Sequence, residues 1–157
     1  MDKLKIRKAS YKDKDTLLVF EQGVIDAERP FDPTLKREST RYYDLDLMID
    51  SALVELLVAE FDGEPVGCGY ARIETSKPYL KHKQHAYLGF MYVVPSFRGK
   101  GINKAIITAL QSWIRKNGIT EMRLEVYHHN QSAIKAYEKV GFVQHMIEMR
   151  KGLEDAD

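Results

Sequence analysis

The part of the sequence that most constrains the fold is a β-type run that ends at a proline and is followed by an amphipathic helix. Residues 86–94 are mostly aromatic and aliphatic and end at Pro95, which cannot donate a backbone hydrogen bond to a sheet. Apolar residues then recur at helical spacing at Ile102, Ala105, Ile106, Ala109, Leu110 and Trp113. Asn117 and Gly118 form a typical helix end. A strand that leads into a long amphipathic helix predicts a sheet covered by helices.

The remaining chain alternates between stretches with strand and helix character. We predict strands over residues 4–9, 53–61, 66–74, 122–126 and 142–149, and helices over residues 12–25, 38–50 and 131–140. The segment Asp62-Gly63-Glu64-Pro65 joins two of these strands and is a short-turn sequence typical of a hairpin. This order of elements predicts an α/β (α+β) fold with a mixed central sheet flanked by helices.

The composition describes one domain without an unusual charge. A length of 157 residues suits a single core over residues 1–157. The 24 basic and 23 acidic side chains give a net charge of +1, which argues against nucleic-acid and membrane-surface partners. The single cysteine, Cys68, excludes an internal disulfide and suits a reducing compartment. No apolar run approaches the roughly 18 residues of a membrane helix, so we expect a soluble, cytoplasmic protein.

A glycine-rich turn connects the strand at residues 86–94 to the following helix. It contains Arg98, Gly99, Lys100 and Gly101. Glycines allow the backbone to approach a ligand closely, and the first turn of a helix presents unpaired N–H groups to an anion. The spacing fits neither a Walker A loop nor a Rossmann fingerprint, which makes a nucleotide site the weaker interpretation. Taken alone, the segment is better explained as a tight turn with solvated basic side chains.

A second motif follows at residues 130–142. Asn130 is placed to cap a helix, Ala133 and Tyr137 share one helical face, and Gly141 ends the helix before Phe142. Each residue alone has an ordinary structural explanation, as a cap or as part of the core. The value of the motif lies in its order, because it follows the glycine-rich turn with one predicted strand between them.

Together these motifs resemble the GNAT superfamily of N-acetyltransferases. Arg98 and Gly101 match the acetyl-CoA pyrophosphate loop, whereas Asn103 stands where the family has a small residue. Residues 130–142 match the Asn-x-x-Ala-x-x-x-Tyr-x-x-x-Gly-Phe signature at every anchor. The resemblance covers residues 4–149 and is weak before residue 52. It implies a mostly antiparallel sheet and a bulged or splayed strand end at residues 91–94.

The resemblance also assigns roles to individual residues. It implies that acetyl-CoA is the cosubstrate and is bound by Val93, Val94, Arg98, Gly99, Lys100, Gly101, Ile102, Asn103 and Asn130. It implies that Tyr137 is the general acid that protonates the departing thiolate, a role that suits a phenol with a reference pKa of ~10. No metal is expected, because the adjacent His128 and His129 lack the spacing of a chelating pair.

The general base is not assigned by the sequence. The position that carries a carboxylate in many members of the family is Gly89 here. Glu74, Glu125, His85 or an ordered water chain could accept the proton instead. Four acidic residues fall in the region that usually forms the acceptor side in this family and would suit a cationic amine, namely Glu21, Asp26, Glu28 and Asp32.

The sequence therefore predicts an enzyme that moves an acetyl group from acetyl-CoA to a primary amine of a small molecule or peptide. The alternative is a module of the same fold that binds acyl-CoA as a sensor or partner without turnover; the presence of Tyr137 argues against it. Similar proteins often form homodimers, and aromatic residues beyond the needs of one core point the same way, namely Tyr42, Tyr43, Tyr79 and Tyr87. We therefore expect a homodimer and no nucleic-acid or membrane partner.

Overall fold

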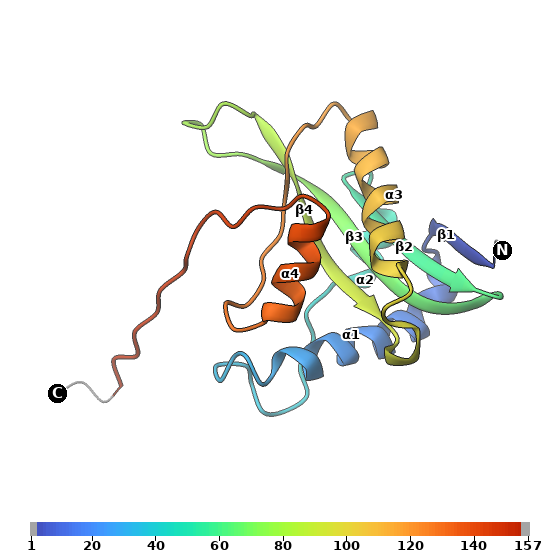
Figure 1. The fold of residues 1–157 in the computed structure, drawn as a ribbon, viewed down its shortest axis with the longest axis horizontal. Coiled ribbons are helices and arrows are strands. Elements are labelled where there is room, and N and C mark those ends of the chain that lie inside the picture. The colour runs from blue at the N-terminus through green and yellow to red at the C-terminus, as the bar shows by residue number, and fades with distance from the viewer. Residues whose placement is uncertain (1–2, 155–157) are drawn as a thin grey trace.

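The protein folds into one central sheet with helices on both faces (Figure 1). A computed structural model describes residues 3–154. The sheet has five strands in the order β1-β2-β3-β4-β5. They are β1 (Leu4–Lys8), β2 (Val54–Phe61), β3 (Glu64–Thr75), β4 (Gln84–Val93) and β5 (Met122–Arg123). All neighbours are antiparallel except β4 and β5, which are parallel. This arrangement confirms the predicted mixed, mostly antiparallel sheet.

Alternation along β2 divides the core into two layers. Leu57 and Ala59 face α3 (Ile102–Lys116), whereas Leu56 and Val58 face the opposite layer. That second layer contains α1 (Lys14–Glu28) and α2 (Leu45–Asp50). Because side chains of a strand point alternately to its two faces, one strand contributes to both layers.

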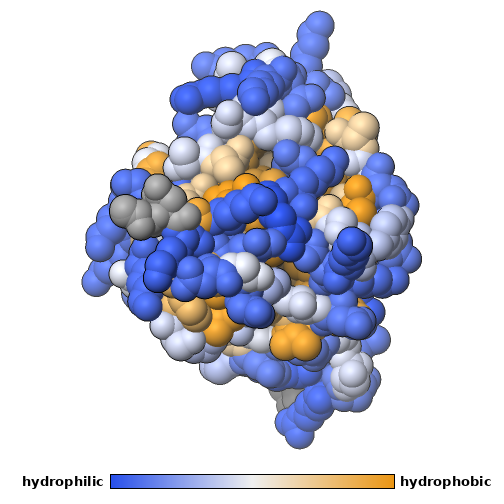
Figure 2. Space-filling view, turned by 90° about the vertical axis from the view of Figure 1, so that its right-hand side faces the viewer, coloured by the Kyte–Doolittle hydropathy of each residue, from blue (hydrophilic) through white to orange (hydrophobic). Residues whose placement is uncertain are grey.

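Helix α3 has the buried stripe that its sequence predicts. The side chains of Ile106 and Leu110 are fully buried against the sheet, and Ile114 continues the same face. On the side of the molecule that carries β1 and α3, hydrophilic residues predominate and hydrophobic ones show between them without forming one continuous area (Figure 2). Burial of one face and solvation of the other is the expected result for an amphipathic helix on a sheet.

The β2–β3 hairpin is also confirmed. Its two turn residues, Asp62 and Gly63, have φ angles of 53° and 82°. Positive φ at both central positions is the signature of a type I′ turn, whose twist matches that of the two strands.

The predicted helix over residues 38–50 is wrong in its first half, because only Leu45–Asp50 are helical. The cause is Glu21, a fully buried carboxylate on α1. It accepts hydrogen bonds from the backbone N–H groups of Tyr42 at 2.6 Å and Tyr43 at 2.8 Å and from Arg41 Nε at 2.5 Å. A buried charge needs such donors, and these bonds hold residues 41–43 outside a helix.

The last two predicted strands are shorter than expected or absent. β5 comprises only Met122–Arg123, and residues 142–149 form no strand in the described chain. Beyond the pair Tyr87 and Arg123, β4 and the segment after β5 are not paired. The outer edge of β5 is only two residues long, too short to pair with residues 142–149, and Figure 1 shows them running away from the sheet as the red end of the ribbon.

Candidate active site

The sheet opens on the side where β4 and β5 part. The two strands pair only at Ala86 with Met122 and at Tyr87 with Arg123. Helix α4 (Gln131–Lys139) lies on this side of the sheet, and its Tyr137 packs against the core cluster that α3 covers. The opening is therefore bounded by the second half of β4, the segment after β5 and α4.

A β-bulge bends β4 at this opening. Cys68 pairs with Tyr92 and Tyr70 pairs with Gly89, so Phe90 and Met91 together face Gly69. Phe90 has a φ of 53°, a left-handed conformation that is uncommon for an aromatic residue. The bulge begins one residue before the segment 91–94 in which the family resemblance implied it, and it redirects the strand toward the glycine-rich turn.

The glycine-rich turn has the geometry of an anion cradle. Gly99 and Gly101 have φ angles of 78° and 81°, and a Cβ atom added to either would meet no other atom within 4 Å. The first hydrogen bond of α3 runs from Ala105 N to Gly101 O at 3.0 Å. The N–H groups of residues 102–104 precede this bond and thus have no partner within the helix. Open space in front of a helix N-terminus fits a pyrophosphate group.

The two basic side chains of the turn lie against aromatic rings. Arg98 donates from Nε to the carbonyl oxygen of Val93 at 2.9 Å, and its guanidinium lies 5.7 Å from the centre of the Tyr92 ring. The Nζ atom of Lys100 lies 4.9 Å from the centre of the Phe97 ring. Both side chains are exposed. Arg98 therefore ties the turn to the end of β4, and the backbone supplies most of the donors of the cradle.

The second motif forms α4, as its residues predict. The Asn130 side chain accepts a hydrogen bond from Ala133 N at 3.2 Å and caps the helix, and Gly141 with a φ of 102° ends it. Tyr137 packs edge-on against Phe142 with ring centres 5.8 Å apart. Burial, and then the negative charge of Glu28, raise the pKa of Tyr137, so its hydroxyl stays protonated. A protonated phenol beside the opening can donate a proton.

The three suggested bases occupy different places. Glu74 and His85 lie at the far end of the β3–β4 ladder, where Glu74 accepts from Arg72 Nε at 2.7 Å and His85 Nδ1 contacts Ser76 Oγ at 2.7 Å. The part of β4 that separates His85 from the cradle is about 30 Å long. Glu125 lies at the opening and accepts from the Tyr87 hydroxyl at 2.9 Å.

The absence of a carboxylate at Gly89 has a steric reason. A Cβ atom at this position would lie 2.7 Å from the hydroxyl oxygen of Tyr70. The Tyr70 ring thus fills the space that a side chain at position 89 would need. Any carboxylate that serves the opening has to come from another element.

Sequence reasoning missed the polar cluster that joins the end of α1 to the segment after β5. The Tyr42 hydroxyl donates to Glu28 Oε1 at 2.8 Å, and the Tyr127 hydroxyl donates to Asp32 Oδ2 at 2.8 Å. The rings of Phe31 and Tyr127 stack with centres 6.2 Å apart. The acidic residues were visible in the sequence, but no local pattern links Tyr127 to a residue so distant along the chain.

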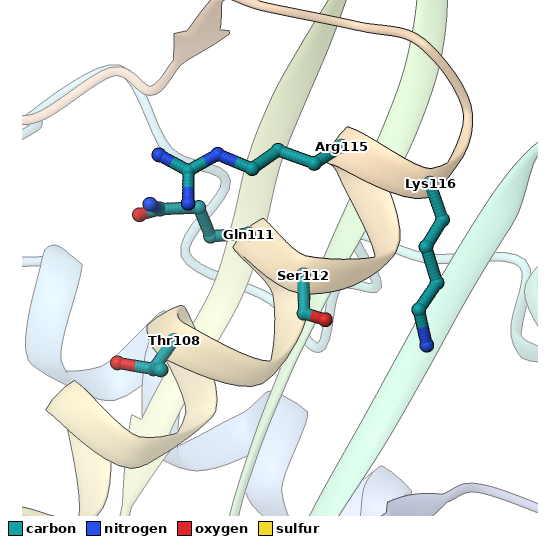
Figure 3. A pocket seen from close by; sticks show the side chains of 5 residues that line it. All are labelled: Thr108, Gln111, Ser112, Arg115 and Lys116. Atoms are coloured by element: carbon teal, nitrogen blue, oxygen red, sulfur yellow. The ribbon is translucent and has the colours of Figure 1, made fainter.

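Other features lie outside the opening. Cys68 is fully buried and unbridged, and burial raises the pKa of its thiol, as befits a core residue. A hollow of about 410 Å³ is lined by the outer face of α3 alone, and Figure 3 shows its five side chains rising from that single helix. None of these residues belongs to the cradle or to α4.

Within residues 3–154, no group of three or more His, Cys, Asp and Glu could hold a metal, and no helix could span a membrane.

The chain is similar in sequence to known acetyltransferases. The model of the acetyltransferase (GNAT) family matches residues 22–142. An uncharacterized N-acetyltransferase, YycN, of Bacillus subtilis (strain 168) is 37% identical over 45% of this chain, and the match spans 46% of that protein. Aminoglycoside N(6')-acetyltransferase type 1 of Stenotrophomonas maltophilia is 27% identical over 68% of this chain and 72% of that protein.

A solved structure agrees in fold. A protein described as a predicted acetyltransferase, from Clostridium acetobutylicum and crystallised with acetyl-CoA, has a TM-score of 0.74 at 21% identity, and the match covers 96% of each chain. The region matched by the family contains the hairpin, the bulged strand, the cradle and α4. The chain belongs to the acetyltransferase (GNAT) family of enzymes.

Proposed function

We propose that the protein is an acetyl-CoA-dependent N-acetyltransferase that acetylates a primary amine of a small molecule. The observation that carries this proposal is the open cradle at the N-terminus of α3, which follows the unpaired end of β4; Ile102 at the start of α3 belongs to the core cluster against which Tyr137 packs. The aminoglycoside acetyltransferase among the relatives and the acetyl-CoA of the Clostridium structure support the choice of acceptor and cosubstrate.

In this proposal each part of the opening has one task. The glycines and free N–H groups of the cradle, residues 98–103, bind the pyrophosphate, and Val93 and Val94 run beside the pantetheine arm. Asn130 keeps α4 in place by capping it. The amine attacks the thioester carbonyl directly, and Tyr137 gives its proton to the thiolate as the carbon–sulfur bond breaks.

A turnover assay tests this function. We expect the protein to release free thiol from acetyl-CoA when one member of an acceptor panel is present. The panel contains an alkyl diamine, an aminoglycoside, an amino acid amide and a short peptide. Binding of acetyl-CoA without thiol release from any acceptor would favour the sensor alternative. Failure to bind acetyl-CoA by calorimetry would contradict both.

We further propose that the protein forms a homodimer through its C-terminal segment, residues 143–153. Five large apolar side chains of this segment are more than 70% exposed, namely Val143, Met146, Ile147, Met149 and Leu153. The hydrogen bonds of its side chains to the described part of the protein join Gln144 to Glu138 and Arg150 to Thr34, both at 3.2 Å. An extended apolar segment held by polar contacts alone is suited to a partner strand or hollow.

A second copy offers the matching surface. Beside the open edge of β5 lies a hollow of about 330 Å³ whose apolar lining includes Ile119, Met122, Val140 and Phe142. Burying a large apolar side chain is worth ~1.5–3 kcal/mol, which corresponds to about 60–120 Å² each. Each segment would bury its five side chains on the other copy, and the surfaces that accept them would bury a similar area. The total is then roughly 1,200–2,400 Å², the size of a stable interface.

The dimer has a direct test. Light scattering at tens of micromolar protein should give about twice the chain mass of 18.1 kDa. Ile147→Glu with Met149→Glu should give the monomer, because four charges would have to be buried in each dimer. Val19→Glu with Leu47→Glu, two exposed apolar positions on α1 and α2, is the matched control and should remain dimeric. A wild-type protein of 18.1 kDa would overturn the proposal.

A further inference from the structure

Glu28 is a carboxylate near the opening to which the family resemblance assigns no catalytic role. It is the last residue of α1 and is half-buried. The Tyr42 hydroxyl donates to its Oε1 atom at 2.8 Å. Within the described chain no donor is within hydrogen-bond distance of Oε2, so one oxygen atom is free to accept a proton.

Glu28 lies among aromatic hydroxyls that come from different elements. Its charge contributes to raising the pKa of Tyr42 and Tyr43 from the loop after α1, of Tyr127 after β5 and of Tyr137 on α4. The contact of Asp32 with Tyr127 places the end of α1, with Glu28, against the segment that bounds the opening, and the charge of Glu28 acts on Tyr137, the residue that we propose as the acid.

The neighbouring acidic residues do not share this environment. Glu21 is fully buried and its two oxygen atoms accept from Arg41, Tyr42 and Tyr43. Asp26 is exposed on the outer side of α1. Asp32 accepts from Thr34 and Tyr127, and these bonds lower its pKa. Burial, together with the charge of Asp32, raises the pKa of Glu28 despite the bond from Tyr42.

We propose that Glu28 is the general base, which accepts the proton of the acceptor ammonium before attack. This inference rests on the acetyl transfer proposed above. A primary amine with a pKa near ~10, as in lysine, arrives protonated at neutral pH and has no lone pair for attack. Glu28 binds the ammonium as its counter-ion and then removes one proton from it.

The protons balance through the reaction. The ammonium gives its first proton to the Glu28 carboxylate, which later releases it to solvent. The free amine forms the carbon–nitrogen bond and the carbon–sulfur bond breaks. The thiolate takes the proton of Tyr137, and the second proton of the nitrogen returns to the Tyr137 oxygen through water. The products are the amide, CoA as a free thiol and one proton in solution.

The sign of the pH dependence follows from this role. Glu28 works only as a carboxylate, so kcat/KM should fall as the pH decreases through its raised pKa. Glu28→Gln keeps the size of the side chain and an oxygen atom for Tyr42 but cannot accept a proton. We expect kcat for a primary alkylamine to fall ~100-fold or more and the acidic limb assigned to Glu28 to disappear. Asp15→Asn, which removes an exposed carboxylate from the first turn of the same helix, should leave kcat within threefold.

A second acceptor separates catalysis from a structural role. An alkoxyamine, R–O–NH2, is a weak base that is already neutral at pH 7, so it needs no deprotonation before attack and loses only the second proton, by the route through Tyr137 described above. With it, Glu28→Gln should reach a rate within about threefold of wild type. An equal loss with the alkylamine and the alkoxyamine, or an unchanged rate with the alkylamine, would overturn the proposal. Calorimetry with CoA should give the same affinity for both proteins, and absence of turnover by wild type itself would instead contradict the acetyl transfer.

Discussion

Replacing Tyr137 with phenylalanine should lower kcat for acetyl transfer by ~100-fold or more, which is at least ~2.7 kcal/mol of transition-state stabilisation. The change removes a single hydroxyl group and keeps the ring that packs against Phe142. Affinity for CoA and the midpoint of thermal unfolding should therefore stay close to those of wild type. The measurement is kcat across pH with the acceptor identified by the panel.

The control for this variant is Tyr79→Phe, which removes the same hydroxyl from an exposed ring in the β3–β4 connection. It should leave kcat unchanged. If Tyr137 served only the core, its replacement by phenylalanine would also leave turnover nearly unchanged. A kcat within threefold of wild type, with acetyl transfer rate-limiting, would exclude Tyr137 as the acid.

Features set by neighbouring residues could be predicted from the sequence. The stripe of α3 with Ile106 and Leu110, the Asp62–Gly63 turn and the cap by Asn130 all depend on contacts within a few residues. Local periodicity and turn chemistry specify such features. This is why the fold class and the shape of the cradle follow from the sequence.

Features set by distant contacts could not be predicted in the same way. Residues 38–44 have a helical pattern, but the buried Glu21 takes the N–H groups of Tyr42 and Tyr43 for itself. Residues 142–149 have a strand pattern, but a strand needs a partner edge and the open edge of β5 comprises only Met122–Arg123. In both cases a tertiary constraint overrides the local preference.

The features of the candidate site also fall into those set by neighbouring residues and those set by distant contacts. The cradle and Tyr137 are found by motif, because their spacing is local. The bulge at Phe90 and the position of Glu28 are not, because each depends on which residue lies opposite in space. The structure also explains why Gly89 cannot carry a base, since the Tyr70 ring occupies the space beside it. In our proposal the base on the acceptor side therefore comes from α1.

Replacing Gly101 with glutamate should abolish or strongly weaken binding of CoA and acetyl-CoA. The carboxylate would enter the open space in front of α3, where we place the pyrophosphate, and like charges would repel in a partly desolvated site. We expect affinity to fall at least ~10-fold, or ~1.4 kcal/mol, in calorimetry. Gly101 has a φ of 81°, so any side chain also strains the backbone by about 1–2 kcal/mol.

A second glycine, at the other end of the same helix, provides the control for the effect of backbone strain. Gly118 has a φ of 75° and equally open surroundings, so Gly118→Glu introduces a similar strain and the same charge. The length of α3 separates the two positions by about 22 Å. Both variants should lose stability in thermal unfolding, Gly118→Glu more than Gly101→Glu because a carboxylate is unfavourable at a helix C-terminus and favourable at an N-terminus, whereas only Gly101→Glu should lose affinity for CoA. Equal CoA affinity in the two folded variants would show that the cradle does not bind the pyrophosphate, and acetyl-CoA would then have to be placed elsewhere on the sheet.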